Sequence, residues 1–226
     1  MSQLTLSQTQ KAETTHSDWN HVIQLGGVVA WVQLACLVVG IGIMLLLGAE
    51  PTTAAEYFRV IQNDGLAGYL RLDFATLLMI TLFPFIAVAL YAAFRQSRPA
   101  YALLTLVLLL LGTLLALANH SAFSMIHLSK LYAAAPLAQQ PQLLTAGEVV
   151  IATDMWHGTA GFLAGIFMQG GFIFISFVML RTPGFSKGTA YTGILANGLD
   201  FLHVFIALFA PALASTLLAV GGVFYL

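Results

Sequence analysis

Long apolar runs recur along this chain, and they restrict its possible folds more than any other feature. A helix needs about 20 mostly apolar residues to cross the hydrocarbon core of a bilayer. Runs of this kind cover residues 22–48, 72–94, 99–121, 158–180, 189–209 and 211–226. We therefore predict an all-α fold, a polytopic transmembrane bundle of about six helices, because helices satisfy their own backbone hydrogen bonds in lipid.

Composition excludes several classes of protein. Of the 226 residues, 59% are hydrophobic and 8% are charged, whereas soluble domains have about 25% charged residues. The chain has 8 Lys and Arg against 9 Asp and Glu, so it lacks the basic surface that nucleic-acid binding requires. The single cysteine, Cys36, lies in an apolar run and predicts neither a disulfide framework nor a cysteine-ligated metal centre. The composition indicates an integral membrane protein.

Two regions are predicted. Residues 1–21 are rich in Ser, Thr and Gln and are expected to form a polar cytoplasmic tail, and residues 22–226 the six-helix transmembrane domain. After the first span, Tyr57 and Phe58 share one side of a possible short helix, a pattern typical of an interfacial helix on the outer leaflet. Residues 133–147 contain two prolines and a Gln cluster, and we expect a plain connection there.

The basic residues predict an orientation, because Lys and Arg beside the spans stay on the cytoplasmic side. Five of them lie on one side of the predicted bundle: Lys11, Arg95, Arg98, Arg181 and Lys187. The sequence therefore predicts a multi-pass protein of the cell membrane, of the bacterial inner membrane type, with its N-terminus in the cytoplasm.

Few ionisable side chains lie within or beside the apolar runs, and a charge at the bilayer centre costs roughly 2.5–3.5 kcal/mol. The five that matter most here are Asp154 and His157 at the start of the fourth run, His120 near the end of the third, and Asp200 and His203 within the fifth. Counting along each helix at about 1.5 Å per residue brings all five into one layer. We therefore predict a polar His and Asp cavity in the outer half of the bilayer.

A metal-assisted reaction is the first functional hypothesis. Asp154 lies three residues before His157, and Asp200 lies three residues before His203. In a helix this spacing puts both members of each pair on one face. Catalytic zinc takes three protein ligands and a water molecule. The candidate ligands are His120, His157 and His203, and the candidate catalytic residues are Asp154 and Asp200. The substrate would be a lipid or lipid-like molecule from the outer leaflet.

Three other functions stay open. Asp200 and His203 are suited to binding and releasing protons or a cation in a small proton- or ion-coupled transporter. Two of the candidate histidines could ligate a haem in an electron-transfer subunit. The polar layer could instead order helix packing in a structural or assembly subunit, with Asp73 paired to Arg71 at the surface. The expected partners are membrane lipids and a homo-oligomer or larger membrane complex.

One segment resembles a known family. Residues 178–199, VMLRTPGFSKGTAYTGILANGL, join two apolar runs through a polar hinge. This segment resembles the corresponding loop and helix of a family of small bacterial multi-pass integral membrane proteins that form a domain of unknown function. The resemblance is carried mainly by residues 178–226. It implies six helices and supplies no catalytic residues.

Overall fold

The computed structural model describes residues 2–48, 50–207, 209–210 and 213, with side chains from residue 18 onward. These residues contain nine α-helices and no strand, which confirms the all-α class. In chain order the helices are α1 (Ser2–Leu47), α2 (Ala54–Asn63), α3 (Gly65–Leu70), α4 (Phe74–Phe94), α5 (Pro99–Ala118), α6 (Ala122–Ala134), α7 (Gln140–Ala152), α8 (Thr159–Leu180) and α9 (Lys187–Ile206).

Four helical stretches among the described residues are long and apolar enough to cross a membrane. They are Asp18–Leu47 in α1, Phe74–Phe94 (α4), Pro99–Ala134, which covers α5 and α6, and Thr159–Leu180 (α8). Helix α9 is not among them because polar residues such as Asn197 and Asp200 lower its mean hydropathy. The sixth predicted run lies outside the described residues apart from residue 213. The predicted count of about six spans is therefore not confirmed.

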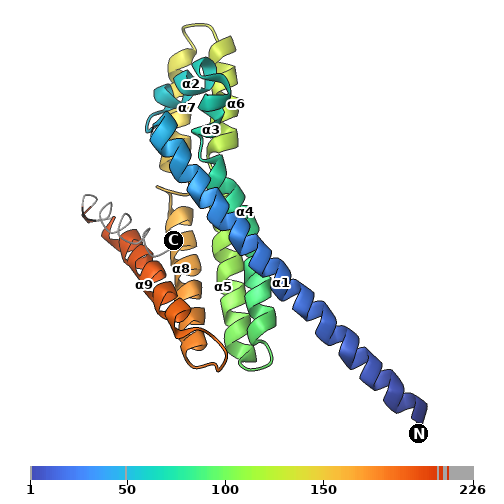
Figure 1. Ribbon diagram of the computed structural model, residues 1–226. Helices are drawn as coiled ribbons and strands as arrows, with labels where there is room; N and C mark the ends of the chain where they lie inside the picture. Colours follow the sequence, from blue (N-terminus) through green and yellow to red (C-terminus); the bar gives the residue numbers. More distant parts are fainter. Residues whose placement is uncertain (1, 49, 208, 211–212, 214–226) are drawn as a thin grey trace.

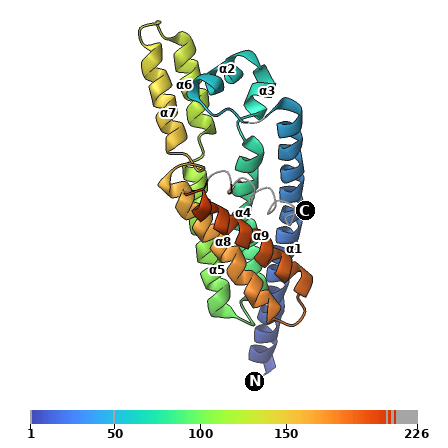
Figure 2. The ribbon, with the colours of Figure 1, turned by 90° about the vertical axis from the view of Figure 1, so that its left-hand side faces the viewer.

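The long helices form a row in which each packs on the next. Helix α1 contacts α4, α4 contacts α5, α5 contacts α8, and α8 contacts α9 (Figures 1 and 2). Small residues bring these helices close. A Cβ added at Gly112 of α5 would lie 2.5 Å from Met168 Cγ and 2.9 Å from the Ala164 carbonyl oxygen of α8. Close backbone approach of this kind is how helices associate in lipid.

A proline interrupts α4, and a neighbouring helix supplies a donor beside it. Pro84 has no N–H, which removes one hydrogen bond from the preceding turn. The buried Gln33 side chain of α1 donates to the Met79 carbonyl oxygen in that turn, with an Nε2–O distance of 2.7 Å. A side chain of α1 therefore hydrogen-bonds to the α4 backbone beside the carbonyl that the proline leaves without its helical donor.

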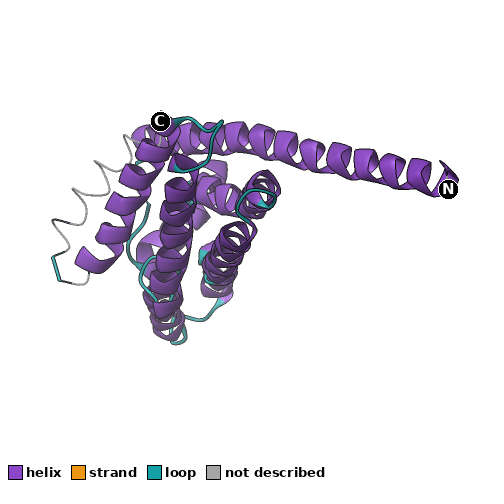
Figure 3. Cartoon of the chain, turned by 90° about the horizontal axis from the view of Figure 1, so that it is seen from below, coloured by secondary structure: helices purple, strands orange, loops and turns teal. Residues whose placement is uncertain are grey.

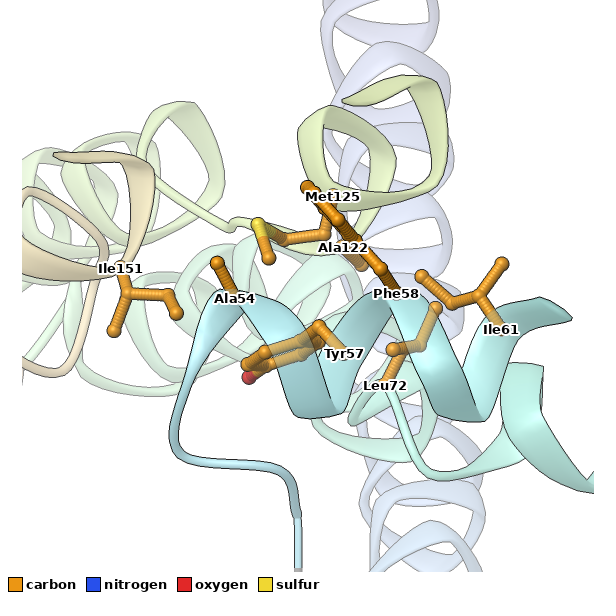
Figure 4. Close-up of a cluster of buried hydrophobic side chains, with 8 residues drawn as sticks. All are labelled: Ala54, Tyr57, Phe58, Ile61, Leu72, Ala122, Met125 and Ile151. Atoms are coloured by element: carbon orange, nitrogen blue, oxygen red, sulfur yellow. The ribbon is translucent and has the colours of Figure 1, made fainter. Parts of the chain in front are cut away.

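Helices α2, α3, α6 and α7 form a separate head at one end of the row (Figure 1). Its core includes Tyr57, Phe58 and Ile61 of α2, packed against Met125 of α6 and Ile151 of α7 (Figure 4). Helix α5 alone has 20 residues, about 30 Å, which is enough to cross the hydrocarbon core. Helix α6 continues beyond it after a break at 119–121, so α5 has the length of a span without α6.

The head corrects two expectations. The segment 133–147 is not a plain connection, because most of it belongs to α6 and α7. The apolar side of α2 packs against α6 and α7 and is buried in the head core, where an interfacial helix would present that side to lipid. Residues 2–17, expected to be a polar tail, continue α1 as a helix that extends away from the other helices (Figure 3).

Candidate functional site

Each of the four connections between the membrane helices and the head carries at least one ionisable side chain. Glu50 lies between α1 and α2, Asp73 between α3 and α4, and His120 between α5 and α6; Asp154 and His157 lie between α7 and α8. Tyr57 of α2 is close to Glu50. We call these six residues the boundary cluster. Their charges act on one another, with Glu50 facing Asp73, Asp154 and His157, and His120 facing Asp73 and Asp154.

Glu50 and Tyr57 form one half of the cluster. The Tyr57 hydroxyl donates to Glu50 Oε1, with an oxygen–oxygen distance of 2.5 Å. Burial raises the pKa of Glu50 to about 7, and the negative charges of Asp73 and Asp154 act in the same direction. The Tyr57 hydrogen bond and His157 oppose the shift. Burial also raises the pKa of Tyr57, so its hydroxyl stays protonated as a donor.

Asp73 is held in an unusual backbone conformation at the start of α4. Its φ of 57° and ψ of 32° lie in the left-handed region, which costs a non-glycine residue about 1 kcal/mol or more. Burial raises the pKa of Asp73, and interactions with Thr76, His120 and Trp156 oppose this shift without cancelling it.

Asp154 organises the α7–α8 connection. Its side chain is buried, and Oδ1 accepts the backbone N–H groups of Trp156 at 2.8 Å and His157 at 3.0 Å. The same oxygen lies 3.0 Å from His157 Nδ1. Because a carboxylate only accepts hydrogen bonds, Nδ1 carries the proton in this contact. The His157 side chain is 60% exposed, and Nε2 is left as the proton acceptor.

The α5–α6 connection contacts the α7–α8 connection through hydrogen bonds. The Asn119 carbonyl oxygen accepts the Met155 N–H at 2.9 Å, and the Ser121 hydroxyl donates to Asp154 Oδ2 at 3.5 Å. His120 Nδ1 accepts the Ala122 N–H at 3.3 Å, so the proton of a neutral His120 lies on Nε2. The α5–α6 and α7–α8 connections are therefore linked by two hydrogen bonds.

Asp200 belongs to a second polar contact, deeper along the bundle. Its Oδ2 accepts a hydrogen bond from Gln169 Nε2 of α8 at 3.3 Å. Gln169 lies ten residues after the start of α8 at Thr159, about 15 Å along the helix axis. His203 is one turn further along α9 than Asp200. The contacts thus pair Asp154 with His157 and Asp200 with Gln169, in two sites at different depths.

The metal hypothesis gains no support from this geometry. Within the described part of the chain, no three His, Cys, Asp or Glu side chains gather as metal ligands would. His120, His157 and His203, the predicted zinc ligands, do not form such a group. The Asp154 carboxylate binds the His157 ring and two backbone N–H groups instead of facing an ion with it.

Sequence reasoning missed several members of the site. Tyr57 was assigned to an interfacial helix, and Glu50 was not singled out, since nothing in their local sequence indicates burial by the head. A usable signal was the position of Glu50 directly after the first apolar run. Gln169 was missed because it is not ionisable, although an amide inside an apolar helix also needs a partner.

The described residues form an all-helical protein with four helical stretches long and apolar enough to cross a membrane. A head packs at one end of them, and the cluster of ionisable side chains lies where the two meet. Comparison with protein families, with characterised proteins and with solved structures finds no match to this chain.

Proposed function

We propose that this protein is a small proton-coupled membrane transporter in which the boundary cluster is the site where protons enter and leave. The proposal rests mainly on helix α8, which starts at one polar site and reaches the other. This helix begins directly after Asp154 and His157 and carries Gln169, which donates to Asp200 about 15 Å further on. One helix therefore connects a titratable site at the membrane boundary with a carboxyl group inside the bundle.

The chemistry of the two sites suits proton transfer. Glu50, with a pKa near 7, exchanges its proton readily at neutral pH. The exposed His157 presents Nε2 as a hydrogen-bond acceptor while Asp154 holds Nδ1. Asp200 is an intramembrane carboxyl, a type of group that commonly marks an ion or proton path.

Protonation of the cluster is expected to change how the head sits on the membrane helices. Glu50, Asp73 and Asp154 come from three different connections, and ionisation of Glu50 above its pKa adds a third negative charge to the group. Ionisation of Glu50 therefore raises the electrostatic repulsion among the three carboxyl groups. Proton uptake would thereby alternate the boundary between a tighter and a looser arrangement.

The orientation and the span count belong to the same proposal. The α4–α5 and α8–α9 connections carry only basic charged residues, whereas the head and its four connections to the membrane helices together carry six of the 9 acidic residues. This distribution supports a cytoplasmic N-terminus and a head on the opposite side, in a bacterial inner membrane. With α9 as a fifth crossing, about 30 Å long at 20 residues, and residues 211–226 as a sixth, the chain would have six spans.

Flux measurements in proteoliposomes test the proposal. With a pH gradient across the vesicle membrane, we expect proton movement, followed with a trapped pH-sensitive dye, that protein-free vesicles lack. Asp200→Asn should abolish it, because the amide cannot carry a proton. Glu50→Gln should remove the pH dependence around neutral pH. Asp64→Asn, in the exposed turn between α2 and α3, is the matched control and should retain flux.

Either of two results would contradict the proposal. Protein that is folded and inserted but gives no flux above empty vesicles, over a range of candidate co-substrates, excludes transport. Flux that persists unchanged in Asp200→Asn would show that the α8–α9 site is not on the path.

A further inference from the structure

The end of the bundle opposite the head gathers aromatic and basic side chains around Arg95. Arg95 follows the last residue of α4, and its guanidinium carbon lies 4.0 Å from the centre of the Trp19 ring of α1. The Trp19 ring meets Tyr91 of α4 edge to face, with 6.1 Å between ring centres. A cation held over a tryptophan face is positioned rather than freely mobile.

A third element joins this group. Phe185, in the connection between α8 and α9, stacks on Phe94, the residue before Arg95, with 4.4 Å between ring centres. Arg181 and Lys187 lie at the two ends of that connection. Figure 1 shows the α4–α5 and α8–α9 connections at the same lower end of the molecule. Trp19, Arg95 and Phe185 therefore bring three separate segments together.

The local charge is positive. Arg98, Arg181 and Lys187 are exposed around Arg95, and the sequence has no Asp or Glu in either connection. The one acidic side chain described near this end, Asp18, is exposed on α1. Arg95 Nε is buried and has no hydrogen-bond partner among the residues that the structure describes. An arginine fork in this setting is suited to binding a phosphate through paired N–H donors.

We propose that this end of the bundle binds the phosphate of an anionic phospholipid, with Arg95 as the central contact. The aromatic group lies where the membrane helices α4, α5, α8 and α9 begin or end, which is the depth of the headgroups. Basic clusters at this depth bind acidic lipids. The assignment is independent of proton coupling, since it uses none of the boundary cluster.

Quenching of Trp19 fluorescence by brominated lipids tests the assignment. A variant with Trp31→Phe and Trp156→Phe leaves Trp19 as its sole tryptophan. It is reconstituted in phosphatidylcholine vesicles that contain an equal fraction of either brominated phosphatidylglycerol or brominated phosphatidylcholine. We expect phosphatidylglycerol to be preferred about five-fold beside Trp19, the effect of about one basic residue at a membrane surface. Higher salt should reduce the preference.

Matched variants locate the effect. In the same background Arg95→Gln should bring the two lipids to equal quenching, and Arg98→Gln should reduce the preference partly. Arg59→Gln, an exposed arginine of the head, should leave it unchanged. Unaltered quenching by brominated phosphatidylcholine shows that each variant is folded and inserted.

Three outcomes would overturn the assignment. They are equal quenching by both lipids in the parent, a preference that survives both Arg95→Gln and Arg98→Gln, and an equal loss in Arg59→Gln. Inorganic phosphate distinguishes the source of the anion. Addition of millimolar phosphate should not relieve quenching by brominated phosphatidylglycerol, and relief would identify a site for the free ion instead.

Discussion

The head and the row of membrane helices are built on opposite patterns of burial. In the head, large side chains such as Phe58 and Met125 are at most 1% exposed. In α1, Leu45 is 74% and Leu46 85% exposed, and contacts in the row depend on small residues such as Gly112. Exclusion of water drives the first kind of packing, whereas close backbone approach drives the second. Ionisable groups collect where the two kinds of packing meet.

The largest expected difference between the two regions comes from truncating an apolar side chain. Phe58→Ala removes the centre of the head core and should destabilise the head by about 3–5 kcal/mol, because Phe58 is buried and also contacts Tyr132. Hydrogen exchange of α2 and α6 in reconstituted protein measures this. Leu46→Ala, in a region that faces outward, should change the exchange little, and an equal effect from both would refute the contrast.

Enlarging a small residue should have the converse effect. Gly112→Leu places atoms where Met168 and the Ala164 carbonyl oxygen already lie, and we expect a loss of about 1–3 kcal/mol between α5 and α8. Unfolding in mixed micelles measures the change. Gly42→Ala, at a position with open space beside it, is the control and should be neutral or slightly stabilising. A neutral Gly112→Leu would show that close approach does not hold the row together.

The third expected effect concerns pH and the boundary. The pKa of Glu50 is raised from 4.5 to about 7, so the folded protein binds more protons than the unfolded chain between these values. Stability should therefore fall as pH rises from 4.5 to about 7 and then level off. The thermal unfolding midpoint of the head, measured as a function of pH, detects this loss of stability. In Glu50→Gln the fall should be reduced, leaving the smaller contribution of Asp73, whose pKa is also raised.

Glu56→Gln provides the control for that profile. Glu56 is on the same side of the boundary, but hydrogen bonds from Thr52 and Thr53 lower its pKa, so it titrates below the window in which Glu50 acts. Its replacement should leave the profile between 4.5 and 7 unchanged. A profile that is the same in the parent and in Glu50→Gln would remove Glu50 from the account.

The sequence predicts the membrane helices well and the head poorly. The predicted runs 72–94 and 158–180 agree with Phe74–Phe94 and Thr159–Leu180 within two residues, because length and apolar character suffice to define a span. The segments that form α6 and α7 are mixed in polarity and are separated by Pro136. Their apolar side chains are buried because α2 packs on them. This contact joins segments far apart in the chain, so local sequence patterns do not predict it.

The site divides in the same way. His120, Asp154 and His157 were predicted at one depth together with Asp200 and His203. In the structure the first three interact with one another and with Asp73, whereas Asp200 contacts Gln169 at a different depth. The pairing of Asp200 with Gln169 and of Glu50 with Tyr57 depends on how helices face each other. Helical phase within one segment does not determine which neighbour lies opposite.

The most direct test of the account is whether Glu50 exchanges a proton near neutral pH while it lies at the boundary. Infrared difference spectra of reconstituted protein, recorded on either side of pH 7, detect the carbonyl band of a protonated carboxyl group. The account predicts a band that disappears with a midpoint of about 7, that is absent in Glu50→Gln and that persists in Glu56→Gln. A spectrum without a titrating carboxyl in this range, or a band unaffected by Glu50→Gln, would contradict it.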